Sequence, residues 1–428
     1  MSLSTPLRLH SPLVVVMVGL PARGKTYIAH KLAGYLGWLG YTAQVFNVGN
    51  YRRDRFGAQV PASFFDPENA EGMESRRQAA LTALQDMLSW LRDGGGGGQI
   101  GIYDATNSTQ ERRKLVRERC EQAGADVLFI ETICDDADII ESNIRQTKLS
   151  APDYAGMDPE EAVADFRRRI AHYERAYEPI DEPDVTMVKL LDVDHRVIAQ
   201  RLKGYVEGRI AHFVMNLHIT PRRIWLTRHG ESTANVAGVV GTDMPLTARG
   251  AQYAAALRRF VDAQDVPQTT IWTSTLQRSV QTAAKLDRDT LALKVLDEID
   301  AGICDGMSYA QIAEQMPGEY ARRKADKLGY RYPRGESYED VIGRLDPVII
   351  ELERQRDPVL VVGHQAVLRA LYGYLTGRPR AEVPYLEIPM HTVVELIPRA
   401  YGCDETHHVL GPELNGERRP DPRLPSTP

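Results

Sequence analysis

The chain has 428 residues, which is long enough for two or three domains. With 43% hydrophobic and 26% charged residues it has a globular composition, and its net charge of −6 argues against a nucleic-acid partner. The sequence has no apolar run of membrane-spanning length and no secretion signal at its start, so we expect no membrane partner. Four scattered cysteines, without the spacing of metal ligands, predict reduced thiols and a cytoplasmic location.

A glycine-rich loop follows the first predicted strand. The run Leu13–Val18 is β-branched and suits a strand buried on both faces, and residues 26–38 have helical spacing. Between them lies a phosphate-binding loop that matches its pattern at every required position: Gly19, Leu20, Pro21, Ala22, Arg23, Gly24, Lys25 and Thr26. Lys25 would reach the β- and γ-phosphates of a nucleoside triphosphate, and the Thr26 hydroxyl would ligate Mg²⁺.

Polar side chains follow the next predicted strands. Arg52 lies in a basic segment just after the strand Ala43–Asn47, and Asp104 ends the strand that begins at Ile100. Substrates of a parallel α/β sheet lie beyond the carboxyl ends of its strands, so these residues suit an anionic substrate. Asp104 is expected to hold Mg²⁺ or to orient the attacking hydroxyl. A solvated basic turn is the alternative for the arginines.

The remaining segments of the first half have clear local patterns. We expect helices at Met73–Leu91, Asp165–Tyr177 and His195–Phe213, and strands at Val127–Ile130 and Val185–Leu191, the latter being the last strand of this half. Arg169 and Tyr173 are four residues apart and share one helix face. An extended connector containing Pro221 predicts a domain boundary near Met215–Arg222, with domains at 1–218 and 219–428.

The first half resembles the 6-phosphofructo-2-kinase family. The matching motifs are the phosphate loop continued by Tyr27, the segments at 45–53 and 104–107, Cys134-Asp135-Asp136, and residues 150–154. The resemblance implies ATP and Mg²⁺ as cofactors, Asp104 as an acid near the transferred phosphoryl group, and ATP contacts at Asn143 and Lys148. It also implies a site for fructose 6-phosphate built from Arg52, Arg76, Thr106, Arg112, Lys148, Arg169 and Tyr173.

The second half presents two histidines at predicted strand ends. The buried strand Ile224–Leu226 leads to Arg228-His229-Gly230, and the strand Val359–Val362 leads to His364. Arg278 follows a third strand, and Glu298 lies in a loop bounded by glycine. Parallel strand ends meet at one sheet edge, so we expect these side chains to lie together.

This set of side chains fits phosphoryl transfer to histidine without a metal ion. His229 would attack phosphorus, while Arg228, Arg278 and His364 neutralise the phosphate oxygens. Glu298 would protonate the leaving alcohol and then assist the water that hydrolyses the phosphohistidine. Unrelated polar loop residues are the alternative interpretation.

The second half resembles the histidine phosphatase superfamily, whose fold is that of phosphoglycerate mutase. Motifs at 297–302, 332–338 and 364–369 narrow the resemblance to fructose-2,6-bisphosphatases. It implies that the sugar bisphosphate is bound by Tyr309, Arg323, Lys327, Tyr338, Gln365 and Arg369. Asn235 and Gly241, in the loop after the His229 motif, are predicted to join this substrate site.

The sequence therefore predicts an α/β protein of two domains: a P-loop kinase with a mainly parallel sheet, then a histidine phosphatase. By resemblance it is a bifunctional, homodimeric enzyme that makes and hydrolyses fructose 2,6-bisphosphate, a control point between glycolysis and gluconeogenesis. Two alternatives remain: the same chemistries on another metabolite or on nucleic-acid ends, and a non-catalytic sensor of ATP and sugar phosphate. The segment after Gly411 is expected to be disordered, and the short terminal segments give no support for control by phosphorylation.

Overall fold

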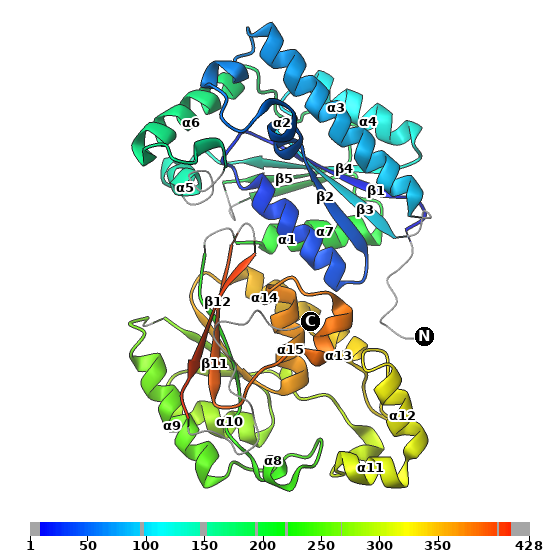
Figure 1. The fold of residues 1–428 in the computed structure, drawn as a ribbon, viewed down its shortest axis with the longest axis vertical. Helices are drawn as coiled ribbons and strands as arrows, with labels where there is room; N and C mark the ends of the chain where they lie inside the picture. The colour runs from blue at the N-terminus through cyan, green and yellow to red at the C-terminus, as the bar shows by residue number, and fades with distance from the viewer. Residues whose placement is uncertain are drawn as a thin grey trace. The chain divides into compact units, whose positions relative to one another are not determined.

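The structure, a computed structural model, describes residues 9–94, 98–145, 152–192, 196–218, 221–266, 268–399 and 402–411. The chain divides into two compact units, one covering Pro6–Ile219 and the other taking in Thr220–Pro428. Each unit is built on a six-stranded sheet (Figure 1), which confirms the predicted α/β class. Lys148 and the segment after Gly411 lie outside the described residues.

The sheet of the first unit has the strand order β2-β3-β1-β4-β5-β6. All neighbouring strands are parallel except β5 and β6, which are antiparallel. The strands are β1 (Leu13–Val18), β2 (Thr42–Asn47), β3 (Gln99–Asp104), β4 (Asp126–Ile133), β5 (Met187–Leu191) and β6 (Arg196–Gln200). Every residue of β1 and β3 is buried, as expected for central strands covered on both faces.

Helices cover both faces of this sheet (Figure 1). Val14 and Val16 of β1 pack with Met87 of α3 and Val116 of α4 on one face. On the other face α1 lies against α7, with the rings of Tyr35 and Phe213 stacked 4.2 Å apart. The helices are α1 (Lys25–Trp38), α2 (Val48–Phe56), α3 (Ala70–Asp93), α4 (Gln110–Gln122), α5 (Ala137–Asn143), α6 (Pro159–Glu174) and α7 (Tyr205–Asn216), with short 3₁₀ turns η1 (Ala62–Phe65) and η3 (Pro152–Tyr154).

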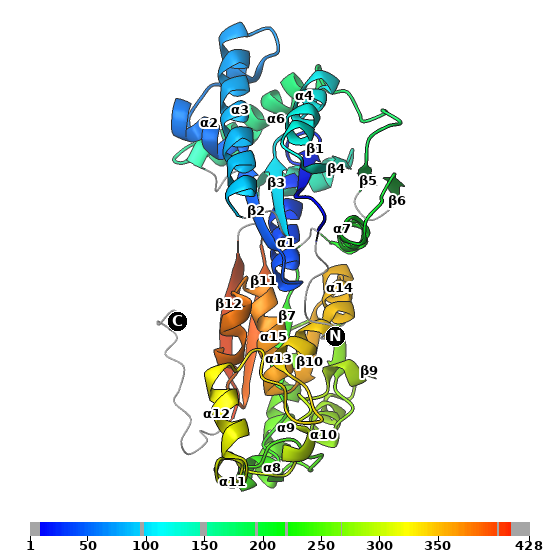
Figure 2. The same cartoon turned by 90° about the vertical axis from the view of Figure 1, so that its right-hand side faces the viewer.

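The predicted helix at His195–Phe213 is wrong in its first part. Residues Arg196–Gln200 form β6, which pairs with β5 (Figure 2), so the strand ending at Leu191 is not the last of this unit. Val197 and Ile198 are β-branched and favour an extended backbone, and pairing with β5 decides the outcome. Helix α7 begins only after Gly204, whose backbone N–H donates to the Glu207 carboxylate at 3.2 Å.

The sheet of the second unit has the order β12-β11-β7-β10-β8-β9. Its strands β7, β10, β8 and β9 are parallel, whereas β11 is antiparallel to both of its neighbours. The strands are β7 (Ile224–Arg228), β8 (Thr270–Thr273), β9 (Thr290–Ala292), β10 (Val359–Gly363), β11 (Thr392–Pro398) and β12 (Cys403–Val409). Because β7, β8 and β10 are parallel neighbours, the residues after them meet at one sheet edge.

Helices again cover both faces of the second sheet (Figure 1). Leu257 of α9 and Ala283 of α10 pack against Trp225, Ile271 and Leu360 on one face. The almost entirely buried α15 lies on the other face. The helices are α8 (Thr233–Ala237), α9 (Ala248–Asp262), α10 (Gln277–Ala283), α11 (Tyr309–Gln315), α12 (Pro317–Ala325), α13 (Tyr338–Arg344), α14 (Asp346–Arg354) and α15 (Gln365–Leu375), with 3₁₀ turns η4 (Ala284–Leu286), η5 (Lys294–Leu296), η6 (Gly302–Cys304) and η7 (Arg380–Tyr385). None of the helices in the described residues has both the length and the apolar composition needed to span a bilayer.

Candidate active sites

The loop between β1 and α1 has a backbone that only glycine fits at its start. Gly19 has a φ of 136°, and a Cβ there would lie 2.5 Å from the carbonyl oxygen of Thr132. At the other end Gly24 caps α1 in the left-handed conformation. Lys25 is the first residue of α1, and its Nζ donates to the carbonyl of Leu20 at 2.5 Å. The lysine therefore bends back over the loop, as phosphate binding requires.

Neighbouring segments hold this loop in place. The Gly19 N–H donates to the carbonyl of Thr106 at 2.9 Å, and Asn143 Nδ2 donates to the carbonyl of Ala22 at 3.1 Å. Two of the predicted ligand residues, Thr106 and Asn143, thus contact the loop directly. Arg23 of the loop donates to the carbonyl of Pro21 at 3.2 Å. Tyr27 is directed elsewhere, with its hydroxyl donating to the carbonyl of His218 at 3.3 Å.

Asp104 lies at the carboxyl end of β3, two residues before Thr106. It is buried, and Asn47 at the end of the neighbouring strand donates to its Oδ2 at 2.5 Å. No cluster of three or more His, Cys, Asp and Glu side chains among the described residues could hold a metal ion by itself. Asp104 ends β3, and Thr26 follows the loop after the neighbouring parallel strand β1. One buried carboxylate and one hydroxyl at this sheet edge suit Mg²⁺, which binds through one or two protein oxygens plus substrate phosphates.

Three of the predicted fructose 6-phosphate arginines surround one aromatic ring. The guanidinium carbons of Arg52, Arg76 and Arg169 lie 5.7, 5.9 and 4.7 Å from the centre of the Phe65 ring. The ring of Tyr173 packs against Phe65 at 5.9 Å between centroids. Residues from α2, α3 and α6 therefore converge on the η1 turn and form a cluster of arginines, of which Arg169 also pairs with Asp165 at 2.9 Å.

Asp153 ties part of this arginine cluster together. Its carboxylate pairs with Arg52, lies 2.8 Å from Arg53 NH1 and lies 3.5 Å from Arg169 NH1. Burial raises the pKa of the Asp153 carboxyl, but the hydrogen bonds and charges of Arg52 and Arg53 outweigh burial and hold that pKa below its ordinary value. The carboxylate thus stays ionised and fixes the direction of three guanidinium groups.

Arg112 is linked to helix α3, which carries Arg76, through the hydroxyl of Tyr103. It donates to the Tyr103 hydroxyl at 2.6 Å, and that hydroxyl donates to the carbonyl of Ala80 at 2.7 Å. Ala80 lies one turn of α3 beyond Arg76. Of the residues predicted to bind fructose 6-phosphate, Lys148 alone falls outside the described residues.

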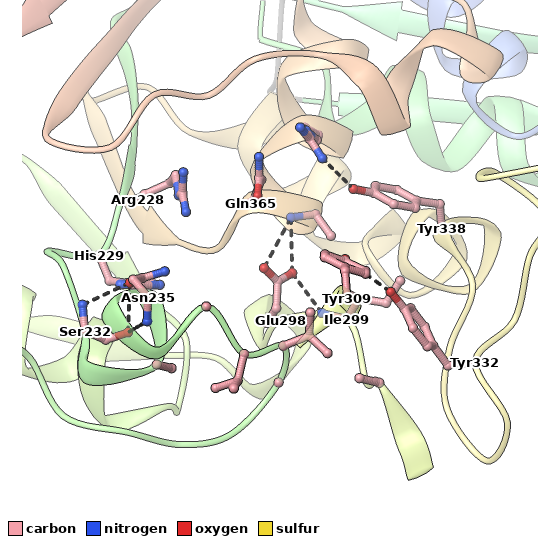
Figure 3. A pocket seen from close by; sticks show the side chains of 18 of the residues that line it. Arg228, His229, Ser232, Asn235, Glu298, Ile299, Tyr309, Tyr332, Tyr338 and Gln365 are labelled. Carbon is pink, nitrogen blue, oxygen red and sulfur yellow. Dashed lines mark hydrogen bonds between the residues drawn. The ribbon is translucent and has the colours of Figure 1, made fainter. Parts of the chain in front are cut away.

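The second site is a pocket with a volume of about 280 Å³ in the Thr220–Pro428 unit. Figure 3 shows Arg228 and His229 at one end, Tyr309, Tyr332 and Tyr338 at the other, and Glu298 between them. The predicted residues that line the pocket are Arg228, His229, Asn235, Gly241, Arg278, Glu298, Tyr309, Arg323, Lys327, Tyr338, Gln365 and Arg369.

His229 has the two ring nitrogens in different surroundings. Its Nδ1 lies 2.7 Å from the carbonyl oxygen of Gly230, so Nδ1 carries the proton and donates it. Arg278 Nε donates to Nε2 at 3.1 Å, which requires a lone pair on Nε2. Burial, followed by the charges of Arg278 and Arg228, lowers the pKa of His229 well below its ordinary value, although the Gly230 hydrogen bond opposes this shift. The ring is therefore neutral and nucleophilic at Nε2.

His364 is fully buried beside His229, with the two ring centroids 5.0 Å apart. It is not among the residues that line the pocket. Its Nε2 lies 2.6 Å from Ser274 Oγ and 3.2 Å from Ser279 Oγ, while its Nδ1 has no hydrogen-bond partner among the described residues. Burial and the neighbouring His229 and Arg278 lower the pKa of His364 well below its ordinary value.

Glu298 projects into the middle of the pocket from the loop before η6 (Figure 3). Its Oε1 accepts the backbone N–H of Ile299 at 2.9 Å and that of Ala366, at the start of α15, at 3.1 Å. These donors fix the carboxyl group between the histidine end and the tyrosine end of the pocket.

The far end of the pocket carries cations held by tyrosines and carbonyl groups. Arg323 donates to the hydroxyls of Tyr332 and Tyr309, each at 2.8 Å, and Arg369 NH1 donates to the Tyr338 hydroxyl at 3.0 Å. Burial, then the charges of Arg369 and Arg323, lowers the pKa of Lys327 to about 8. This end suits a second phosphate group on the substrate.

The sequence matches two families in succession. The 6-phosphofructo-2-kinase family matches residues 2–221, and branch 1 of the histidine phosphatase superfamily matches residues 224–409. The chain is 47% identical to the 6-phosphofructo-2-kinase/fructose-2,6-bisphosphatase of Gallus gallus, over 98% of this chain and 89% of that protein.

Identity to the Caenorhabditis elegans protein of the same name is 45%, over 97% of this chain and 92% of that protein. Identity to the Homo sapiens 6-phosphofructo-2-kinase/fructose-2,6-bisphosphatase 3 is 46%, over 93% of this chain and 77% of that protein. The chain belongs to the 6-phosphofructo-2-kinase/fructose-2,6-bisphosphatase family. Membership in this bifunctional family confirms the resemblance found in both halves of the sequence and the prediction of a kinase joined to a histidine phosphatase.

Several residues of the two sites escaped the sequence prediction. Phe65 organises the arginine cluster, yet nothing local distinguishes it from a core phenylalanine. Tyr332 lies inside the motif at 332–338, and its hydroxyl-bearing ring in that motif could have identified it as a site residue. Ser274 and Arg344 act on His364 and on the Glu298 loop through side-chain contacts that only the folded chain brings about.

Proposed function

We propose that this chain synthesises fructose 2,6-bisphosphate from fructose 6-phosphate and ATP, and hydrolyses it back to fructose 6-phosphate. The observation that carries this proposal is the pairing of two sites in one chain. The Pro6–Ile219 unit has a phosphate loop with an arginine cluster. The second unit has a buried, neutral His229 whose unprotonated Nε2 accepts a hydrogen bond from Arg278.

In the kinase reaction the loop N–H groups and Lys25 bind the ATP phosphates. Thr26 and Asp104 would hold Mg²⁺, which would offset the negative charge of the phosphate oxygens. Arg52, Arg76 and Arg169, the cluster around Phe65, bind fructose 6-phosphate through its phosphate. Asp104 is the acid proposed near the transferred group, and its Oδ2 already accepts a hydrogen bond from Asn47. The rate of phosphoryl transfer therefore comes mainly from positioning and charge neutralisation.

In the phosphatase reaction Nε2 of His229 attacks the 2-phosphate, and the bond from phosphorus to the sugar oxygen breaks. Arg228 and Arg278 neutralise the phosphoryl oxygens, and His364, whose ring lies 5.0 Å from that of His229, helps to stabilise the same charge. Glu298 gives its proton to the leaving sugar oxygen and then takes a proton from the water that attacks the phosphohistidine. Arg323, Lys327 and Arg369 bind the 6-phosphate, while Tyr309, Tyr338, Gln365, Asn235 and Gly241 surround the sugar.

We also propose a cytoplasmic homodimer. The four cysteines are free thiols, in keeping with a reducing compartment. In the part of the chain that the structure describes, β6 is the last strand of its sheet and pairs only with β5, and its Ile198 is exposed, so its other edge is open to a second copy. Sedimentation equilibrium of the whole chain and of Ile198→Lys tests this assembly, because a charge on that edge should favour the monomer.

Both activities should be measured on one purified sample. Fructose 6-phosphate with ATP should give an acid-labile bisphosphate, and fructose 2,6-bisphosphate should give fructose 6-phosphate and inorganic phosphate. Turnover of other sugar phosphates in preference to fructose 6-phosphate would contradict the substrate assignment. Binding of both ligands without turnover would point to a sensor instead.

A further inference from the structure

An arginine–glutamate pair clamps the segment that carries Glu298. Arg344, the last residue of α13, donates through Nε to Glu336 Oε1 at 2.8 Å and through NH2 to Glu336 Oε2 at 3.2 Å. This is the two-point geometry that makes arginine–carboxylate pairs both strong and directional. Both side chains are about a quarter exposed or less, at 22% and 24%.

The same arginine binds the backbone on the N-terminal side of the pocket acid. Arg344 NH2 donates to the carbonyl of Asp297 at 2.6 Å and lies 3.5 Å from that of Glu298, while NH1 donates to the carbonyl of Val295. One guanidinium group therefore contacts three carbonyl groups within four residues. No other side chain could make all of these hydrogen bonds, because only the planar guanidinium group of arginine carries five N–H donors.

Glu336 fixes the other side of the acid. Its Oε2 accepts the backbone N–H of Asp300 at 3.0 Å, and its own backbone N–H donates to the Asp300 carbonyl at 2.9 Å. The ion pair thus holds residues 295–298 through Arg344 and residue 300 through Glu336. Glu298 lies between these two anchors.

The direction of the Glu298 carboxyl group depends on this backbone. One of its hydrogen bonds is to the N–H of Ile299, the next residue of the clamped segment. If the segment shifts, the carboxyl group moves with it relative to Ala366 and the His229 end of the pocket. Proton transfer to a leaving oxygen requires hydrogen-bond geometry, so a displacement of about 1 Å costs on the order of 10²-fold in rate.

We propose that Arg344 and Glu336 are positioning residues that hold Glu298 in line with the leaving oxygen of the substrate. This inference rests on the proposed role of Glu298 as the general acid. Neither Arg344 nor Glu336 lines the pocket, so they act through the backbone of residues 295–300 rather than by touching substrate.

The leaving group distinguishes this role from a general contribution to folding. With fructose 2,6-bisphosphate, the bond from His229 Nε2 to phosphorus forms as the bond from phosphorus to the sugar oxygen breaks, and that oxygen takes the proton of Glu298. With 4-nitrophenyl phosphate, the departing phenolate is a stable anion and needs no proton. A misplaced Glu298 should therefore slow the first reaction far more than the second.

The test compares Arg344→Gln and Glu336→Gln with the unmodified chain in single-turnover measurements of His229 phosphorylation. We expect the rate with fructose 2,6-bisphosphate to fall by at least ~10-fold in both variants, and the rate with 4-nitrophenyl phosphate to change by less than ~3-fold. Glu298→Gln, which removes the acid itself, should show the same difference between the two substrates to its full extent. Kinase activity in the other unit measures the amount of active chain in each sample, and retained reaction with 4-nitrophenyl phosphate shows that the phosphatase unit is folded.

Arg354→Gln is the matched control, because Arg354 forms another two-point pair in the same unit, with Glu351 at 3.0 and 3.1 Å. It should leave both phosphorylation rates unchanged. Equal losses on the two substrates in Arg344→Gln would overturn the positioning role. If instead Glu298→Gln lacked the selectivity, or the unmodified chain formed no phosphohistidine, the proposed phosphatase mechanism itself would be wrong.

Discussion

Nδ1 of His229 donates to the carbonyl oxygen of Gly230, its own neighbour in the chain, at 2.7 Å. A carbonyl oxygen only accepts hydrogen bonds, so the proton of the neutral ring is fixed on Nδ1. The lone pair is then confined to Nε2, where Arg278 donates at 3.1 Å. The nucleophile is therefore in the correct tautomer before any substrate binds.

His229→Ala should abolish covalent labelling of the chain by fructose 2,6-bisphosphate carrying a radioactive 2-phosphate. The alanine offers no nitrogen to form the bond with phosphorus, and hydrolysis should fall by at least ~10³-fold. Lys25→Met is the control, because it leaves the phosphatase pocket intact and should label normally. Persistent labelling of His229→Ala at another residue would contradict the assignment of the nucleophile.

Lys25→Met should abolish synthesis of fructose 2,6-bisphosphate and leave its hydrolysis within ~2-fold of the unmodified chain. The methionine keeps the length of the side chain but removes the ammonium group that bends over the phosphate loop, a loss of at least ~10²-fold in kcat. Synthesis and hydrolysis are measured on the same sample. A joint loss in a folded variant would contradict the assignment of the two activities to two sites.

Arg76→Gln should raise the KM for fructose 6-phosphate by ~10-fold or more while the KM for ATP changes little. Arg76 belongs to the cationic cluster around Phe65, and it lies 5.6 Å from the Tyr173 ring. Arg77 is its neighbour on α3, and Arg77→Gln is the matched control that removes the same charge from the same helix. A similar rise in both variants would argue for a general electrostatic effect.

Much of the fold followed from local sequence. Buried β-branched runs such as Leu13–Val18 and Val359–Val362, each ending in a glycine or a polar motif, predicted the strands that deliver Lys25 and His364. Strand β6 was missed because residues 196–200 are half exposed and short, so pairing with β5, rather than local preference, decides their structure.

The sequence predicted the site residues that lie in motifs at strand ends, but not the residues that hold them in place. The residues after β7, β8 and β10 had to meet at one edge, so His229 and Arg278 could be grouped from the sequence. The same argument placed His364 with the phosphate-binding residues, and the structure has its ring 5.0 Å from that of His229, with Nε2 held by Ser274, a contact that the sequence does not predict. Long-range side-chain contacts of this kind, like those of Arg344 with residues 295–298, leave no periodic signal in the sequence.

Ser274→Ala should lower the phosphatase kcat by ~5-fold, with little effect on KM. Ser274 Oγ accepts the N–H of Leu276 at 3.3 Å and lies 2.6 Å from Nε2 of His364, so donation by the hydroxyl would place the proton of the neutral ring on Nδ1. Losing one such hydrogen bond costs about 1 kcal/mol. Nitrogen-15 NMR of the histidines should report a changed tautomer of His364. Ser279→Ala, which removes the longer contact of 3.2 Å, should have the smaller effect.

The phosphatase unit should lose stability as the pH falls below about 6.5. Burial and the charges of Arg278 and Arg228 lower the pKa of His229, and burial with His229 and Arg278 lowers that of His364, in each case well below the ordinary value of 6.5. Between the lowered folded pKa values and 6.5, the unfolded chain binds protons at these two positions that the folded chain does not. Acidification therefore favours unfolding, and stability is fully present above the unfolded pKa.

Hydrogen exchange of the buried strands β7 and β10 measures this effect from about pH 7.5 to about pH 5.5. His229→Asn removes one of the two groups, so the loss of stability per pH unit in this window should be about half that of the unmodified chain if the two histidines dominate. The matched control is His212→Asn, since His212 is exposed in α7 of the other unit. Equal slopes for His229→Asn and the unmodified chain would show that His229 is not held neutral in the folded unit.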